Sequence, residues 1–250
     1  MNNIRQSLKI EENRQLTYKS WKMILSGCSI KNPVPGQFVN IEIPGKYLRR
    51  PISVHWYSIS ESRLQIIYDT VGEGTRSLAE MKPGDYLDVL VGLGNGFSIP
   101  DNITRPVILG GGIGVAPLSQ LAVALKEAGK KPVVIFCYNT KNDVIPGLNI
   151  PKELGIPIYI ATVDGSEGIK GFFSDVIDKE NLQFDYFYAC GPTPMLKAVS
   201  NLPVPGQISM ECRMGCGFGA CMCCSLETKN GARRICKDGP VFLKEDVIWK

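Results

Sequence analysis

Hydrophobic and polar positions alternate in short runs over the first hundred residues. Three such runs, QFVNIEI (37–43), RLQIIYD (63–69) and DYLDVLV (85–91), are rich in the β-branched and aromatic residues typical of strands. Proline–glycine turn signals separate the runs, and a short helix is expected at 76–81. Strands at this spacing predict a small antiparallel barrel in residues 1–100.

Near residue 101 the pattern changes to strands that alternate with helices. The run 106–129 predicts a strand, a glycine turn and then a helix of about 14 residues. Three more strands are expected at 132–139, 156–164 and 184–191. Two more helices are expected at 173–180 and 194–200. This alternation predicts a parallel sheet covered on both faces, in an α/β domain of residues 101–205. Residues 206–250 show no clear periodicity and are expected to form a separate small lobe.

Composition and charge narrow the class of protein. The chain has 250 residues, 44% hydrophobic and 21% charged, which is ordinary globular material long enough for two domains. A net charge of +4 without a basic block gives no indication of nucleic-acid binding. No apolar run approaches the roughly 20 residues of a membrane helix, and the N-terminus lacks a signal-peptide pattern. We therefore expect a cytoplasmic protein.

The glycine turn GGGIGVAP (110–117) follows an expected strand and opens a helix. Glycines let a phosphate approach the backbone, and a helix N-terminus offers free N–H groups. The turn differs from G-x-G-x-x-G, because Val115 or Pro117 stands at the third glycine position. Nor does an acidic residue follow the next strand, which ends in Tyr-Asn-Thr-Lys (138–141). The alternative is a turn that only packs a helix on a strand.

A second segment, ACGPTPML (189–196), carries Cys190 at the C-terminal edge of an expected strand, where ligands bind in open α/β sheets. A barrel followed by these two segments resembles the ferredoxin–NADP reductase superfamily. The resemblance implies that the glycine turn faces the NAD pyrophosphate and that Cys190 lies near the nicotinamide. It assigns to NAD the residues Gly110, Gly111, Gly112, Gly114, Cys190, Gly191 and Pro192.

The same superfamily marks its barrel with an Arg-x-[Tyr/Phe]-[Ser/Thr] strand that holds FAD. Here RRPISV (49–54) matches, with Ile52 in place of the usual aromatic residue. A guanidinium suits a pyrophosphate and a serine hydroxyl suits the isoalloxazine edge. The turn VGEGTRSL (71–78) opens the short helix, and the resemblance implies that the strand at 63–69 passes the flavin. The resemblance assigns to FAD the residues Arg50, Pro51, Ile52, Ser53, Ile67, Tyr68, Asp69, Gly74 and Thr75. The lone imidazole, His55, has no catalytic partner in the pattern and is interpreted as a barrel residue.

The stretch CRMGCGFGACMCC (212–224) holds five of the nine cysteines. Within it, C-x4-C-x2-C followed by a distant fourth cysteine is the plant-type [2Fe–2S] spacing. The expected ligands are Cys216, Cys221, Cys224 and Cys236. Glycines at 217 and 219 let the loop wrap a cluster. The alternative is a zinc site, whose ligands would be Cys212, Cys216, Cys221 and Cys224. Cys28 and Cys137 are interpreted as core residues.

The string ECRMGCGFGACMCCSLET…CKDGPVF (211–242), taken with the barrel and turn motifs, resembles the electron-transfer subunits of type B dihydroorotate dehydrogenases. The resemblance implies an oxidoreductase subunit of pyrimidine biosynthesis that links NAD, through FAD and a [2Fe–2S] cluster, to FMN in a catalytic subunit. It also implies a heterotetramer with two copies of each subunit. Cys212 and Cys223 depart from the family pattern.

Two other classes of protein remain open. One is the flavin subunit of another complex, such as a sulfide dehydrogenase, a transhydrogenase-type bifurcating enzyme or a hydrogenase. The other is a binding module with a structural zinc. The residues leave NAD and NADP undecided, since Lys141 suits a 2′-phosphate and no acid selects the 2′-hydroxyl; the resemblance implies NAD.

Overall fold

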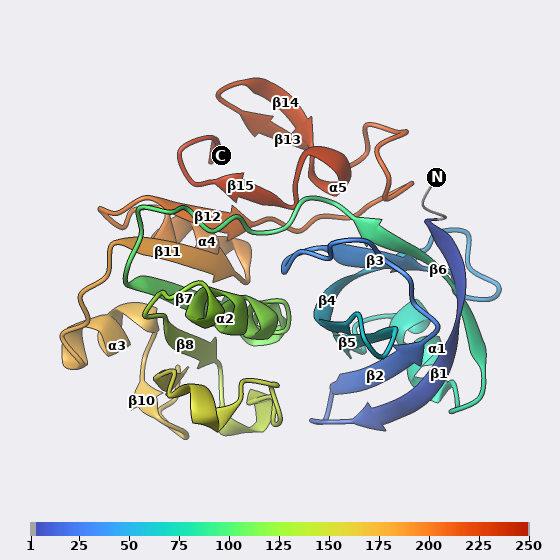
Figure 1. Ribbon diagram of the computed structural model, residues 1–250, viewed down its shortest axis with the longest axis horizontal. Coiled ribbons are helices and arrows are strands. Elements are labelled where there is room, and N and C mark those ends of the chain that lie inside the picture. Colours follow the sequence, from blue (N-terminus) through green and yellow to red (C-terminus); the bar gives the residue numbers. More distant parts are fainter. Residues whose placement is uncertain (1–3, 250) are drawn as a thin grey trace.

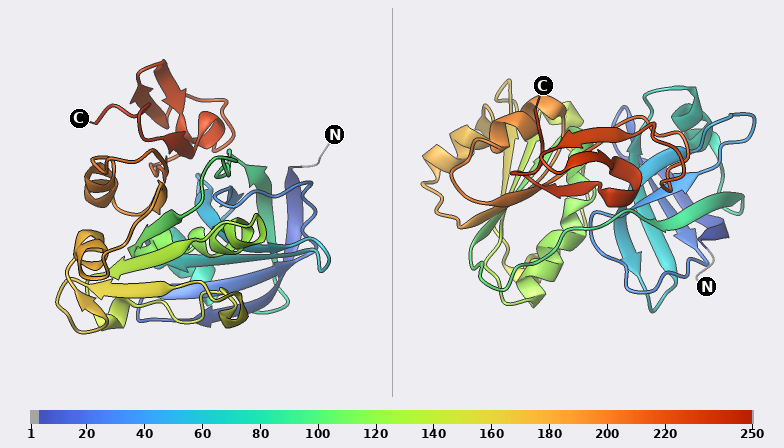
Figure 2. Two further views of the ribbon diagram at one scale, coloured as in Figure 1. Left: turned by 60° about the vertical axis from the view of Figure 1, so that its left-hand side comes forward. Right: turned by 90° about the horizontal axis from the view of Figure 1, so that it is seen from above.

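The computed structural model describes residues 4–249, which form a barrel, a helix-covered sheet and a small lobe (Figure 1). The barrel and the sheet stand side by side, and the lobe lies across the seam between them (Figure 2). Among the described residues, no helix has both the length and the apolar character needed to cross a membrane.

The first hundred residues close into a six-stranded antiparallel barrel, with strand order β1-β2-β5-β4-β3-β6. The strands are β1 (Arg5–Gln15), β2 (Ser20–Ser26), β3 (Phe38–Ile41), β4 (Arg50–Ser58), β5 (Arg63–Asp69) and β6 (Tyr86–Leu93). The three strands predicted from alternation are β3, β5 and β6. The predicted barrel is confirmed.

Alternation along β5 separates the barrel interior from its outer face. Leu64 and Ile66 are fully buried inside the barrel, whereas Ile67 points outward and packs into the apolar core of the neighbouring α/β domain. Helix α1 (Glu73–Glu80) begins at Glu73, earlier than the predicted 76, because Gly72 serves as its N-cap. The buried side chain of Leu78 attaches this helix to the barrel core.

A seven-stranded sheet follows, with order β10-β9-β8-β7-β11-β12-β15. Its strands are β7 (Pro106–Gly111), β8 (Val133–Tyr138), β9 (Ile158–Thr162), β10 (Ile169–Lys170), β11 (Tyr186–Cys190), β12 (Gly206–Ser209) and β15 (Val241–Leu243). The helical elements around it are η1 (Gly112–Val115), α2 (Leu118–Glu127), η2 (Lys141–Asp143), η3 (Lys152–Leu154), α3 (Phe173–Lys179) and α4 (Thr193–Val199). Only β15 runs antiparallel to its neighbour, so the parallel sheet expected from the sequence is largely confirmed.

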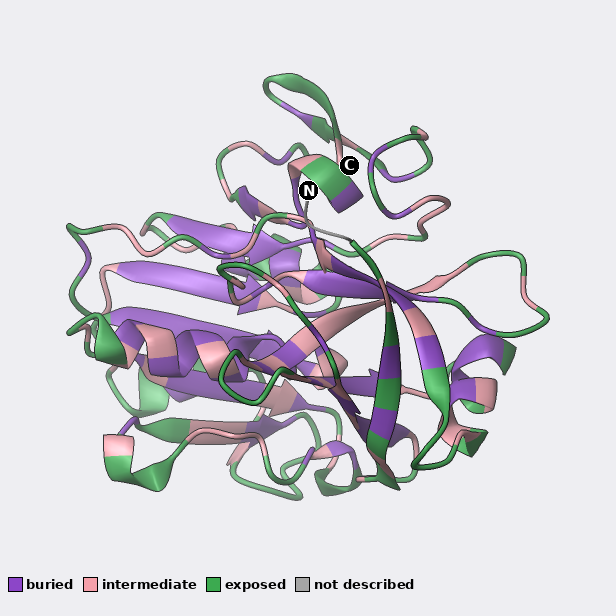
Figure 3. Cartoon of the chain, turned by 45° about the vertical axis from the view of Figure 1, so that its right-hand side comes forward, coloured by how far each residue is buried: buried purple, intermediate pink, exposed green. Residues whose placement is uncertain are grey.

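Alternating residues of the central strands point to the two faces of the sheet. Ile108 packs with α2 on one face, and Leu109 packs with α3 and α4 on the other. The central strands are accordingly buried along almost their whole length (Figure 3). Helix α2 has ten residues, shorter than the roughly 14 expected, because the chain first makes the 3-10 turn η1.

The sheet extends past the boundary expected at residue 205. Strand β12 pairs with β11, and β15 pairs with β12, with Ser209 opposite Val241. Residues 206–209 and 241–243 therefore lie in the α/β sheet, not in a separate lobe. Neither strand lies in a run as long as the seven-residue stretches from which β3, β5 and β6 were predicted. The C-terminal lobe proper (210–240) contains the cysteine loop, the hairpin β13 (Ser225–Thr228) and β14 (Gly231–Arg234), and the short helix α5 (Ile235–Asp238).

Candidate cofactor site

A cavity of about 490 Å³ lies in the seam between the barrel and the sheet. Strands β4 and β5 form its barrel wall, and η1 with the end of β11 forms the opposite wall. The chain just after β12 closes a third side. Every flavin-binding residue expected from the sequence except Gly74 lines this cavity: Arg50, Pro51, Ile52, Ser53, Ile67, Tyr68, Asp69 and Thr75.

Gly74 contributes to the site by leaving room for the side chain of Arg50. A Cβ at this position would come within 2.5 Å of Arg50 Nε, so the guanidinium rests on the glycine backbone at the start of α1. Among residues 4–249, Arg50 has no carboxylate partner; its side chain donates to the backbone carbonyls of Leu48 and Arg49. An unneutralised guanidinium in a cavity wall suits an anionic group such as a phosphate.

Tyr68 and Thr75 line the cavity, but their hydroxyl groups form hydrogen bonds within the protein. Tyr68 is buried inside the barrel, and its hydroxyl donates to Asn13 at 2.9 Å. The Thr75 hydroxyl accepts from the Val71 and Gly72 N–H groups and donates to the Gly72 carbonyl. Both hydroxyls therefore already have hydrogen-bond partners within the protein.

The glycine turn and the Cys190 segment lie side by side, since β7 and β11 are neighbours and Gly110 pairs with Cys190. A Cβ on Gly114 would lie 2.5 Å from the Cys190 carbonyl oxygen, and one on Gly111 would lie 2.5 Å from Met195 Sδ. Glycine at these positions allows the two segments to touch. The structure thus brings together the two segments that the sequence assigned to one nucleotide.

The remaining nucleotide-site candidates differ in what surrounds them. Gly112 has φ +54°, and among the described residues nothing lies within 4 Å of its would-be Cβ, which leaves room for a ligand. Gly110 instead packs against Phe136 and Val115, which is the packing role that the sequence left open. Only Gly114 and Cys190 of this set line the cavity; Gly110, Gly111, Gly112, Gly191 and Pro192 do not.

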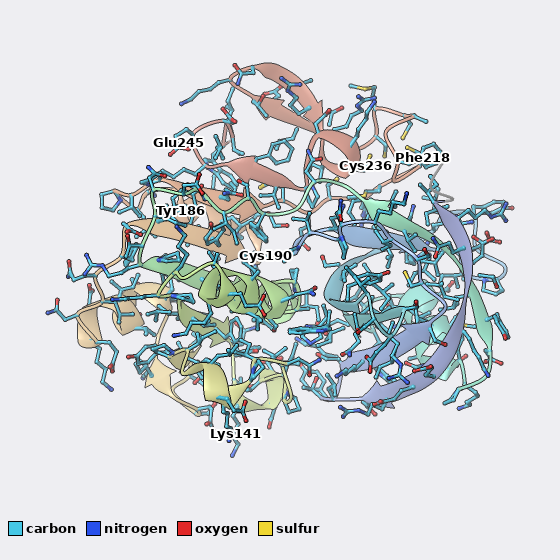
Figure 4. All side chains as sticks on the ribbon, viewed as in Figure 1. Lys141, Tyr186, Cys190, Phe218, Cys236 and Glu245 are labelled. Carbon is cyan, nitrogen blue, oxygen red and sulfur yellow. The ribbon has the colours of Figure 1, made fainter. Side chains whose placement is uncertain are left out.

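Cys190 is the last residue of β11 and lies in the cavity wall, where the sheet faces the barrel (Figure 4). Burial raises its pKa to about 12; the nearby Glu211 carboxylate adds to the rise, and a hydrogen bond with Ser209 opposes it. A protonated thiol is a poor nucleophile. Cys190 is suited to fill space beside a ligand without reacting with it.

The third side of the cavity was not expected from the sequence. It consists of Met210, Glu211, Cys212 and Met214, with Pro240 beside them. Burial raises the pKa of the Glu211 carboxyl. Since this segment leads directly to Cys216, the cavity wall continues into the cysteine loop. Glu211, Cys212 and Met214 belong to the cysteine-bearing string, but nothing in that pattern places them at the cavity; the fold alone brings them there.

The four expected cluster ligands form two thiol pairs. Cys216 Sγ and Cys221 Sγ are 3.5 Å apart, and Cys224 Sγ and Cys236 Sγ are 3.2 Å apart. Among the described residues, no three Cys, His, Asp or Glu side chains converge on one point. The zinc alternative omits Cys236, yet this cysteine is buried beside Cys224.

Backbone N–H groups point at the sulfur atoms. Those of Ala220 and Cys221 lie 3.2 and 3.4 Å from Cys216 Sγ, and that of Cys236 lies 3.4 Å from Cys224 Sγ. Burial raises the pKa of Cys216, but N–H groups from Cys221, Phe218 and Ala220 outweigh it and lower the pKa to about 6. The N–H groups thus stabilise a thiolate at Cys216, the form that binds iron, whereas burial raises the pKa of Cys236 to about 12. Four thiols arranged as two pairs are a donor set that fits an iron–sulfur cluster.

Glycines allow the loop to take this shape. Gly217 and Gly219 have φ +77° and +89°, which only glycine adopts readily. Gly217 also packs on Asn40 of β3, whose amide donates to the Cys216 carbonyl at 3.1 Å. The loop is therefore attached to the barrel.

The other cysteines lie outside these two pairs. Cys212 is half-buried in the cavity wall and Cys223 is exposed. Cys28 is fully buried, as expected for a core residue, and Cys137 is half-buried against the core of the sheet. Burial raises the pKa of both of these thiols to about 12.

Comparison with known proteins places this site in a family. Residues 211–248 match the family model described as the iron–sulfur cluster binding domain of dihydroorotate dehydrogenase B. The dihydroorotate dehydrogenase B (NAD(+)) electron transfer subunit of Fusobacterium nucleatum subsp. nucleatum is 43% identical, over 95% of this chain and 96% of that protein. The subunit of the same name from Geobacillus kaustophilus is 37% identical over 98% of each chain.

Solved structures give the same fold. The NADH-dependent reduced ferredoxin-NADP oxidoreductase, from work on flavin-based electron bifurcation, has a TM-score of 0.88 at 30% identity, over 97% of this chain and 90% of that one. The ferredoxin reductase in carbazole 1,9a-dioxygenase has a TM-score of 0.68 at 22% identity, over 79% of this chain and 64% of that one. The second likeness shows the fold alone.

Fold and site together define an oxidoreductase of the flavin- and NAD-binding reductase class that carries an iron–sulfur domain. Within that class, the chain belongs to the family of electron transfer subunits of dihydroorotate dehydrogenase B (NAD(+)).

Proposed function

We propose that this chain passes electrons between NAD(H) and a separate catalytic subunit that oxidises dihydroorotate to orotate in cytoplasmic pyrimidine biosynthesis. One observation carries the proposal: a single cavity is bounded by three parts of the chain. They are strand β4, which we call the flavin strand, Cys190, and the segment that leads into the cysteine loop. Bound FAD would exchange a hydride with NAD(H) and single electrons with a cluster. Electron transfer requires that the sites for NAD(H), FAD and the cluster lie close to one another. This cavity borders residues expected at the first two sites and the segment that leads to the third.

The barrel residues have distinct parts in holding FAD. Arg50, held against Gly74, offers its charge to the pyrophosphate. Ser53 lines the cavity on β4 and offers a hydroxyl to the edge of the flavin ring. Ile52, which replaces the usual aromatic residue, presents an apolar side chain and not a stacking ring.

The α/β residues would hold NAD. Gly112 leaves open space at the start of the helical turn, where N–H groups suit a phosphate. Gly114 and Cys190 form the cavity wall opposite the flavin strand, which suits the nicotinamide end. The neutral Cys190 thiol would pack beside the nicotinamide without attacking it.

The two thiol pairs would each hold one iron of a [2Fe–2S] cluster, Cys216 with Cys221 and Cys224 with Cys236. The N–H groups directed at these sulfur atoms would stabilise the cluster's negative charge. Phe218 and Met222 expose apolar side chains on the same loop. This loop is the proposed contact with the FMN-bearing catalytic subunit, in a heterotetramer with two copies of each subunit.

The test combines composition and activity. The chain is co-expressed with its catalytic partner and the complex is purified under anaerobic conditions. The expected complex contains FAD, FMN, iron and acid-labile sulfide, and reduces NAD⁺ when dihydroorotate is added. A colourless protein with one zinc would contradict the redox role. A flavin–iron complex without dihydroorotate activity would contradict the pyrimidine role alone.

A bifurcating reductase is the second candidate. It is supported by the likeness, at 30% identity over nearly the whole chain, to the NADH-dependent reduced ferredoxin-NADP oxidoreductase. In that case the co-purifying subunit would bind NADP and exchange electrons with ferredoxin. Reduction of the purified complex with NADPH and with dihydroorotate, in separate anaerobic titrations, distinguishes the two candidates.

A further inference from the structure

His55, the chain's only histidine, lies fully buried between the barrel and the glycine turn. Its Nδ1 is 2.7 Å from the carbonyl oxygen of Ala116. Because a carbonyl only accepts, Nδ1 carries the proton and donates. Among the described residues, Nε2 has no hydrogen-bond partner. Leaving a buried nitrogen unpaired is unfavourable, so fold stability alone does not account for an imidazole here.

The imidazole stays neutral at physiological pH. Burial lowers its pKa to about 4; the bond to Ala116 opposes this, and the nearby Lys22 ammonium adds to it. The hydrogen bond from Nδ1 to Ala116 therefore persists unchanged across the working pH range.

The bond joins the two walls of the cavity. On one side, Ser53 lines the cavity two residues before His55 on the same strand, β4. On the other side, Ala116 itself lines the cavity. A second link lies further along: the Gln120 side chain accepts from the Tyr57 N–H at 3.2 Å and donates to the Tyr57 carbonyl at 3.0 Å. The flavin strand is thus hydrogen-bonded to the turn and to helix α2.

We propose that His55 is a positioning residue, whose bond to Ala116 fixes the separation between the flavin-bearing strand and the turn that faces the nicotinamide. The inference rests on the proposed use of FAD and NAD. The step it serves moves one hydride from NADH to FAD, giving NAD⁺ and, with a proton from water, reduced FAD. Reacting atoms must approach to about 3–3.5 Å, and a misplacement of about 1 Å costs up to a hundredfold in rate.

The experiment compares three variants of the holoprotein. His55→Leu removes the donor, and His55→Asn keeps an N–H close to the position of Nδ1. Asn149→Ala is the matched control, because it removes another bond between the domains, from Asn149 to Gln65 at 2.9 Å, outside the cavity wall. Anaerobic rapid mixing with NADH follows the loss of flavin absorbance. We expect His55→Leu to reduce the hydride-transfer rate at least tenfold with FAD content unchanged, and His55→Asn and Asn149→Ala to stay within threefold of the wild type.

Hydrogen–deuterium exchange provides a readout that does not depend on activity. Faster exchange over residues 110–117 is expected in His55→Leu and not in Asn149→Ala. If His55→Leu fails to bind FAD, His55→Gln replaces it, because its amide reaches one bond too far to restore the contact. A wild-type rate together with wild-type exchange in the substituted protein overturns the proposal. If wild-type protein is not reduced by NADH, the proposed function fails, and the exchange result alone decides the role of His55.

Discussion

The guanidinium of Arg50 rests on Gly74, at a distance that leaves no room for a Cβ. We predict that Gly74→Ala displaces the guanidinium and weakens FAD binding about tenfold, equivalent to about 1.4 kcal/mol. Gly72→Ala is the matched control, since among residues 4–249 nothing lies within 4 Å of its would-be Cβ and its φ is −157°. Flavin fluorescence during titration of the apoprotein measures both affinities. Equal affinities in the two variants would contradict a phosphate contact for Arg50.

Substitutions in the cysteine loop distinguish an iron–sulfur cluster from a zinc site. Cys236→Ser is expected to lose most of the iron and acid-labile sulfide, because Cys236 pairs with Cys224. Cys212→Ser is expected to keep both. A four-thiolate zinc site would instead contain zinc without iron or sulfide. That zinc would be lost in Cys212→Ser and kept in Cys236→Ser. Metal analysis and the visible spectrum of each purified variant decide the matter, and the exposed Cys223→Ser is the control.

The chemical reactivity of Cys190 follows from its environment. Because its pKa is raised to about 12, the thiolate fraction at pH 8 is very small. We predict that iodoacetamide modifies Cys190 at least tenfold more slowly than the exposed Cys223 in native protein at pH 8. Mass spectrometry of peptides taken at successive times gives both rates. Rapid labelling of Cys190 would show that the cavity holds it as a thiolate.

Acid stability is predicted from the contact between the domains at Asp143. Its carboxylate accepts from the Tyr18 hydroxyl at 2.8 Å and pairs with Lys19 Nζ at 2.9 Å. Burial raises its pKa, but these bonds outweigh burial and lower the pKa below the ordinary 3.8. A lowered pKa means that the stabilisation is present above pH 3.8 and is lost as the pH falls through the folded-state value.

Asp143→Asn should therefore lower the free energy of unfolding by about 1–3 kcal/mol at pH 7. The difference from wild type should shrink as the pH falls below 3.8 and through the folded-state pKa of Asp143. Urea unfolding at several pH values measures it, with Asp178→Asn as control, because Asp178 is an exposed residue of helix α3, away from the contact between the domains. A constant difference across the range would exclude a charge effect.

Much of the fold could be predicted from the sequence because its strands carry local patterns. The run 63–69 corresponds residue for residue to β5, whose alternating side chains divide between two cores. Strands β12 and β15 were not predicted, because they have four and three residues and do not lie in runs as long as the seven-residue stretches from which β3, β5 and β6 were predicted. Their pairing joins positions separated by the whole C-terminal lobe, and only tertiary folding reveals it.

The candidate site divides in the same way. Arg50, Gly74, Cys190 and the spaced cysteines stand in motifs, so sequence alone pointed to them. Glu211 reaches the cavity through the path of the chain after β12, which no motif records. Tyr68 lines the cavity, in line with its expected place at the flavin, while its hydroxyl bonds to Asn13 inside the barrel. The alternation along β5 places its side chain on the same side as Ile66.

The pairing of Ser209 with Val241 has an architectural consequence. The chain leaves the sheet at β12 and returns beside it at β15, so the entire cysteine-bearing lobe is an insertion within a β-hairpin. A short turn joining these two strands would remove all the cysteines expected to bind the metal, but also the residues after β12 that wall the cavity, Met210 to Met214. The lobe is therefore inserted into the edge of a two-domain reductase, and its excision would open the expected flavin site at the same time as it removed the thiol pairs.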